Sequence, residues 1–86
     1  MADIYWNLAK SDELKRKRGV SFEEIMKARL LSVMKHPSRP HQKIMLFMHK
    51  GYIWVVPYVV RKKEIFLKTL FPSRKYTKLW IRGELK

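Results

Sequence analysis

The residues best suited to chemistry are Ser73, Arg74, Lys75 and Tyr76, near the end of the chain. Pro72 and Ser73 are typical of a helix start, so Arg74 and Lys75 fall in the first turn. Unpaired backbone N–H groups give this turn a partial positive charge, and a cation there is unfavourable by roughly 0.3–1 kcal/mol. A bound anion reverses that penalty, because the N–H groups, the guanidinium and the ammonium then attract it together. The segment predicts a phosphate site, the alternative being a solvated, slightly unfavourable helix start.

Other kinds of active site find little support in the sequence. The three histidines, His36, His41 and His49, lie near prolines or turns, and the C-terminal half holds only two acids. A triad of nucleophile, histidine and acid therefore lacks its parts, and the histidines are too dispersed for a hydrolytic metal site. The glycines are scattered and form no phosphate-binding loop. We expect neither a metal nor a cofactor.

The charge of the chain points to an anionic partner. The 86 residues include 20 Lys+Arg and 7 Asp+Glu, a formal net charge of +13. Residues 1–24 are neutral as a block, so the whole excess lies in residues 25–86. Nucleic acid is the first candidate partner, an acidic protein the second and a membrane surface the third. The cations expected to bind nucleic acid are Lys50, Arg61, Lys62, Lys63, Lys68, Lys78 and Arg82.

Length and composition indicate one domain, residues 1–86, in a soluble cytoplasmic protein. The absence of cysteine suits a reducing compartment. The start lacks the apolar core of a signal peptide. The longest apolar run, "YIWVVPYVV", is far shorter than the roughly 20 residues of a membrane helix.

Two N-terminal helices are predicted from local signals. Residues 4–6 alternate as a short strand, and Asn7 is positioned to cap a helix that runs to Arg18 and stops at Gly19. Ser21 and Glu24 form a capping box for a second helix that ends at about Arg29. Residues 31–35 fit a strand or a prolonged helix, and we prefer the strand.

Extended segments are expected at residues 42–49, 52–60 and 64–71, followed by a helix that begins at Ser73. Lys50-Gly51 is a hairpin turn between the first two segments, and "RKKE" is a longer turn between the next two. Pro57 predicts a bulge or a gap in strand pairing. The aromatic side chains of Trp54, Phe66 and Trp80 are expected in the core.

The predicted order, β-α-α-β-β-β-β-α, defines an α+β fold. It consists of a small, mainly antiparallel sheet with two N-terminal helices and a C-terminal helix.

The chain resembles the BrnT family of toxins from bacterial toxin–antitoxin systems. The resemblance rests on "WNLAK" at residues 6–10, "KRGVSFEEI" at residues 17–25 and "SRKYTK" at residues 73–78. It implies a RelE/ParE-like fold and a ribonuclease that blocks translation. It also implies inhibition by an antitoxin of the ribbon-helix-helix type, in a toxin–antitoxin hetero-oligomer. Three positions depart from the family pattern: Arg18 replaces a histidine, Tyr76 a small residue and Trp80 an acid.

A metal-free mechanism fits these residues. The 2′-hydroxyl of RNA attacks the adjacent phosphate, while Arg74 stabilises the charge on phosphorus. Lys75 or His49 is the candidate for proton transfer, with Tyr76 as a possible acid. The alternative is a binding module without catalysis, which engages nucleic acid or an acidic antitoxin. The antitoxin is expected to place Asp and Glu over residues 61–63 and 74–78.

Overall fold

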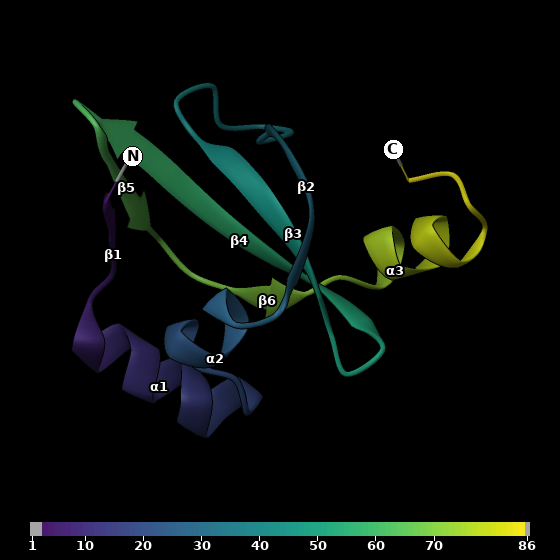
Figure 1. Cartoon of the computed structure of the whole chain (residues 1–86), viewed down its shortest axis with the longest axis horizontal. Coiled ribbons are helices and arrows are strands. Elements are labelled where there is room, and N and C mark those ends of the chain that lie inside the picture. Colours follow the sequence, from purple (N-terminus) through teal and green to yellow (C-terminus); the bar gives the residue numbers. More distant parts are fainter. Residues whose placement is uncertain (1–2, 86) are drawn as a thin grey trace.

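The computed structural model describes residues 3–85, and in this part of the chain three helices accompany a six-stranded sheet (Figure 1). The elements in chain order are β1 (Asp3–Tyr5), α1 (Leu8–Arg18), α2 (Phe22–Met26), β2 (Arg29–Lys35), β3 (Lys43–His49), β4 (Tyr52–Arg61), β5 (Glu64–Leu67), β6 (Phe71–Pro72) and α3 (Arg74–Ile81). The expected α+β class and the positions of the helices are confirmed. Residues 31–35 are strand, as preferred.

The strands form one sheet in the order β1-β5-β4-β3-β2, and the short β6 pairs with β4. Only β1 and β5 run parallel among the described strands, so the sheet is mainly antiparallel as predicted. Helices α1 and α2 lie together at one end of β1, whereas α3 lies at the far end of the molecule from β1 and β5 (Figure 1).

Local capping fixes the two N-terminal helices. The Asn7 side chain accepts from the Lys10 N–H at 2.9 Å, and Gly19 ends α1 with a φ of 79°, a left-handed value that favours glycine. The capping box of Ser21 and Glu24 is present at the start of α2. Helix α2 ends at Met26, earlier than expected, because β2 already begins at Arg29.

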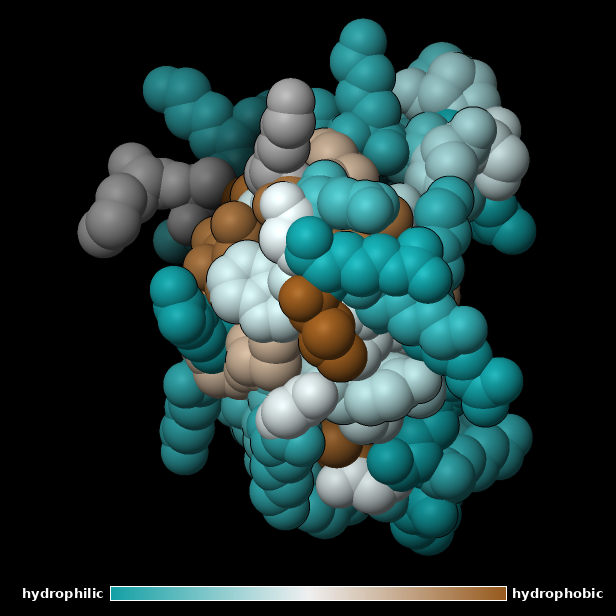
Figure 2. Space-filling view, turned by 90° about the vertical axis from the view of Figure 1, so that its right-hand side faces the viewer, coloured by the Kyte–Doolittle hydropathy of each residue, from teal (hydrophilic) through white to brown (hydrophobic). Residues whose placement is uncertain are grey.

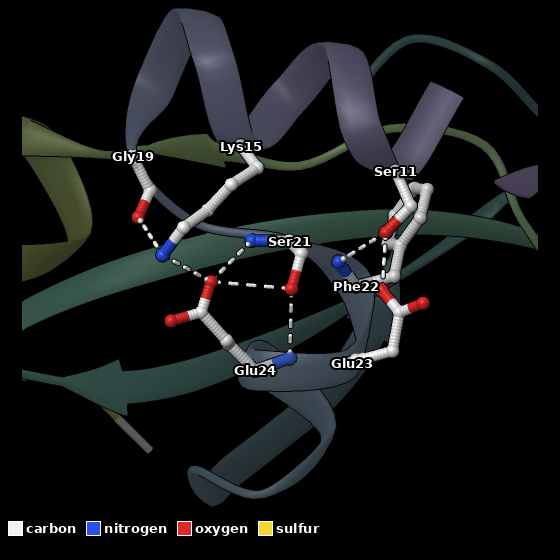
Figure 3. Close-up of polar contacts among 7 residues, drawn as sticks. All are labelled: Ser11, Lys15, Gly19, Ser21, Phe22, Glu23 and Glu24. Carbon is white, nitrogen blue, oxygen red and sulfur yellow. Dashed lines mark hydrogen bonds and ion pairs between the residues drawn. The ribbon is translucent and has the colours of Figure 1, made fainter. Parts of the chain in front are cut away.

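Polar contacts bind α1 to α2 (Figure 3). Lys15 Nζ lies 2.7 Å from the Glu24 carboxylate. This hydrogen bond, together with one from the Ser21 backbone N–H, lowers the pKa of Glu24 to about 2. Buried Ser11 donates to the Glu23 carboxylate and accepts from the Phe22 N–H at 3.0 Å. Because the Phe22 N–H is buried, its partner matters for stability.

Two tight turns set the ends of β4. Lys50 and Gly51 have φ values of 52° and 77°, the pair of positive angles that a two-residue type I′ hairpin needs. This confirms the first predicted turn. The second turn is shorter than predicted, because Arg61 pairs directly with Glu64 and leaves two residues between the strands. The positive φ of Lys62, 55°, allows that tight reversal.

The predicted strand over residues 64–71 is interrupted, and Pro57 lies at the break. Residues 58–61 of β4 pair with β5, whereas Trp54 and Val55 pair with β6. Between these two pairings the chain crosses as a loop, in which the Lys68 N–H donates to the Pro57 carbonyl at 2.9 Å. The gap predicted at Pro57 is thus confirmed, since proline has no N–H with which to continue a ladder.

Each face of the sheet has its own apolar core. The face toward α1 and α2 buries Phe47, Trp54 and Val56 against Phe22 and Ile25. The opposite face buries the residues of β3 and β4 that alternate with these, namely Ile44, Leu46, Ile53 and Val55, and Tyr76 of α3 packs against them. The central strand is therefore covered on both sides where α3 crosses it, as predicted for an apolar run.

Two of the three predicted core aromatics lie outside the core. Trp54 is buried, but Phe66 and Trp80 are 39% and 37% exposed. The prediction was wrong for Phe66 because α3 does not extend over β5. It was wrong for Trp80 because this ring lies at the side of α3, with the Arg29 guanidinium 6.0 Å from its centroid. None of the helices in residues 3–85 has the length and apolar character needed to span a bilayer.

Candidate nucleic-acid interface

Helix α3 begins as the sequence predicted, with Ser73 as its N-cap. The Ser73 Oγ accepts from the Tyr76 N–H at 3.1 Å, and the Ser73 N–H donates to the Ile53 carbonyl at 2.8 Å. The cap uses the third N–H of the helix. The N–H groups of Arg74 and Lys75, the first two, point out of the helix end without an intrahelical acceptor.

Thr77 holds this end of α3 on the sheet, a role that the sequence did not reveal. Its buried hydroxyl accepts from the Ile53 N–H of β4 at 2.9 Å and donates to the Ser73 carbonyl at 2.6 Å. The first bond joins α3 to the backbone of the central strand, and the second joins Thr77 to the N-cap residue of its own helix. The first turn of α3 is therefore held at a fixed position over β4.

The structure keeps the predicted phosphate site accessible. Arg74 and Lys75 are exposed, Tyr76 is half-buried, and the first turn of α3 contains no acidic residue. The Lys75 ammonium lies 5.7 Å from the centroid of the Tyr76 ring. Two cations thus stand beside free N–H groups at a helix N-terminus, which is the arrangement that binds phosphate.

A hollow of about 180 Å³ opens beside this turn. One of its lining residues, His36, is not among the site residues predicted from the sequence. Lys75 and Tyr76 line it from α3, Phe71 from β6, and His36 from the loop between β2 and β3. His36 lies 39 residues before Lys75 in the chain, so only the tertiary fold brings them together. No local motif around His36 indicates the contact.

The hydrogen bonds of His36 determine what its ring can do. Its Nδ1 accepts from the backbone N–H groups of Ser38 and Arg39, each at 3.1 Å. An acceptor nitrogen carries no proton, so the neutral ring has its proton on Nε2. This tautomer makes Nε2–H a hydrogen-bond donor rather than a proton acceptor.

The structure does not bring His49 to this site. His49 pairs with Tyr52, and its ring lies edge-on to Trp54 at 6.4 Å between centroids. Tyr52 and Trp54 belong to the core under α1 and α2, whereas Lys75 lines a hollow on the opposite face with Val55. Strand alternation therefore separates His49 from Lys75 by the thickness of the sheet.

The predicted nucleic-acid-binding cations lie in three places. Arg61 and Lys68 line a second hollow near β1 and β5, and Lys62 and Lys63 form the adjacent turn. Lys50 lies in the turn at the other end of β4. The exposed Lys78 and Arg82 belong to the α3 region of the molecule.

The end of the molecule that carries α3 is dominated by hydrophilic side chains with isolated apolar residues between them (Figure 2).

Comparison with solved structures shows that the chain shares a known fold. The chain is similar to the crystal structure of the Brucella abortus ribonuclease toxin, BrnT, with a TM-score of 0.55 and 16% sequence identity. The match covers 85% of this chain and 97% of that one. No protein-family model matches the chain, and no curated protein matches it significantly. The resemblance read from short sequence motifs is thus supported at the level of the fold.

Proposed function

We propose that this protein is the toxin of a toxin–antitoxin pair and acts as a metal-independent RNA endonuclease that inhibits translation in the cytoplasm. The observation that carries the proposal is the group at the start of α3, where Lys75 and Tyr76 line one hollow with His36 and the exposed Arg74 precedes them in the same turn. These groups can bind and polarise a phosphodiester, and RNA supplies its own nucleophile.

In the proposed reaction, the 2′-hydroxyl attacks the adjacent phosphorus and the bond to the 5′-oxygen of the next nucleotide breaks. A 2′,3′-cyclic phosphate and a 5′-hydroxyl result. The Arg74 guanidinium and the free N–H groups of the first turn stabilise the negative charge on the phosphorane oxygens. His36 adds a hydrogen bond from its Nε2–H.

Proton transfer is assigned to the two remaining groups of the site. Lys75 in its neutral amine form takes the proton of the attacking 2′-hydroxyl and becomes an ammonium, and the Tyr76 phenol gives a proton to the departing 5′-oxygen. Solvent then restores both groups. His49 has no part in this scheme because it lies on the other face of the sheet.

The proposed inhibitor is an acidic antitoxin of the ribbon-helix-helix type, which masks residues 61–63 and 74–78. Val55 lies under α3, and Arg61 lies six residues further along β4. A segment that covers both regions must therefore span about 20 Å, at ~3.3 Å per residue of strand. An extended acidic segment of the antitoxin meets this requirement, and the excess positive charge favours its association.

Cleavage of RNA in the presence of EDTA tests the activity. We expect the purified protein to cut single-stranded RNA in EDTA and to leave 2′,3′-cyclic phosphate ends, read by mass spectrometry of the fragments. If chelation abolishes cleavage and Mg²⁺ restores it, the metal-free mechanism is wrong.

Binding without turnover would instead identify a non-catalytic module. In that case nucleic acid still binds with a log–log salt slope of about −4 to −5, for six or seven phosphates of a single strand.

A further inference from the structure

A row of three apolar side chains, two of them exposed, crosses three strands at the end of the sheet away from α3. Tyr5 of β1 pairs with Phe66 of β5, and Phe66 pairs with Val59 of β4. Paired residues point to the same side of a sheet, so the three side chains form one row. Val59 alternates in step with Val55, so the row lies on the same face as α3.

The two aromatic rings of this row are accessible. Tyr5 is 48% exposed and Phe66 is 39% exposed, and a hollow of about 480 Å³ opens over them. The Tyr5 phenol is neutral at physiological pH, and the carboxylates of Asp3 and Glu64 raise its pKa further. Two neutral aromatic rings on an open sheet face are the kind of surface on which nucleic-acid bases stack.

Cations accompany the rings and continue toward α3. The Lys68 ammonium lies 5.7 Å from the centroid of the Phe66 ring, and Arg61 lines the same hollow. Lys68 also lines a neighbouring hollow of about 280 Å³ that includes His36 and Phe71. These two residues in turn line the hollow beside Lys75. Three adjoining hollows therefore form one path from Tyr5 to the first turn of α3.

The path has a defined length. Phe71 pairs with Val55 and Phe66 pairs with Val59, so the two rings lie about 13 Å apart along β4, at ~3.3 Å per residue. That distance corresponds to about four steps between stacked nucleotides, at ~3.4 Å per step. A path of this length with rings at both ends suits a short single-stranded segment better than a duplex, whose bases are already stacked.

We propose that this path binds single-stranded RNA, with Tyr5 and Phe66 forming a subsite on which a base stacks a few nucleotides from the phosphate held at α3. The proposal rests on the proposed function for the identity of the ligand. Arg61 and Lys68 neutralise the phosphates that flank the stacked base. The subsite selects strands whose bases are free, and it acts at a distance from the cleaved bond.

The test measures the affinity of an octanucleotide of 2′-O-methyl RNA, which cannot be cut because its nucleophile is blocked. Tyr5→Ala/Phe66→Ala should bind it about 5- to 150-fold more weakly than the wild type, the range expected for loss of base stacking. An abasic site is then placed at each nucleotide in turn. At one position, a few nucleotides from the phosphate held at α3, removal of the base should weaken binding to the wild type but not to the variant.

Val60→Ala is the matched control, because Val60 is an exposed apolar residue on the opposite face of the same strand. The inference is overturned if this control loses as much affinity, if every abasic octamer weakens both proteins equally, or if duplex RNA binds as tightly as the single strand. It is also overturned if polyglutamate binding depends equally on Tyr5 and Phe66, since the face then recognises acidic protein. Because the octamer cannot be cut, absence of ribonuclease activity would defeat the proposed function and leave this result standing.

Discussion

Replacement of both first-turn cations, Arg74→Ala/Lys75→Ala, should lower the rate constant for RNA cleavage by about 10³-fold or more. Loss of one donor that stabilises developing charge costs about 10²–10³ in rate, and this variant also removes the proposed proton acceptor. Both side chains are exposed, so the fold should be retained. Single-turnover cleavage at saturating protein measures the chemical step apart from binding.

The matched control removes two cations from the same region, Lys78→Ala/Arg82→Ala. Both double variants carry the same net charge and should lose comparable electrostatic attraction to RNA. Only Arg74→Ala/Lys75→Ala should slow the chemical step. Equal single-turnover rates for wild type and Arg74→Ala/Lys75→Ala would show that these two side chains at the start of α3 take no part in the reaction.

Replacement of His36 should lower cleavage by about 10²-fold, the lower end of the range for one hydrogen-bond donor to a developing anion. His36 also anchors its loop through Nδ1, so His36→Ala alone would not separate the two roles. Asparagine can accept from the N–H groups two and three residues ahead but is too short to reach the phosphate. We therefore expect His36→Asn to keep the wild-type melting temperature and to cleave RNA as slowly as His36→Ala.

His41→Ala, in the same loop, is the control for the loss of a histidine and should cleave at the wild-type rate. Full activity of His36→Asn would show that His36 only shapes the loop. Activity should likewise survive substitution of His49, which the sheet separates from Lys75.

The parts of the fold predicted from sequence are those governed by local chemistry. Asn7 and Gly19 mark the two ends of α1, because an N-cap and a glycine in the left-handed conformation act within a few residues. The capping box of Ser21 and the hairpin at Lys50-Gly51 are equally local. Ser73 belongs to this class too, so the start of the candidate site could be located without tertiary information.

The remaining features depend on which elements meet. Side chains alternate between the two faces of the sheet along β3, so His49 and Ile44 point to opposite faces. The sequence pattern does not indicate which of these faces packs against α3. His36 enters the site only because the loop after β2 returns to the start of α3. Phe66 looks like a core residue in its strand, and it is exposed because α3 is too short and too distant to cover it.

Titration of ¹⁵N-labelled protein with an uncleavable 2′-O-methyl dinucleotide tests directly whether the first turn of α3 binds a phosphodiester. Binding is followed by the amide chemical shifts. We expect the Arg74 and Lys75 N–H signals to shift most, because their N–H groups donate to the phosphate. Unmoved Arg74 and Lys75 signals, with the largest shifts in α1 or at the Lys50-Gly51 turn, would contradict this expectation.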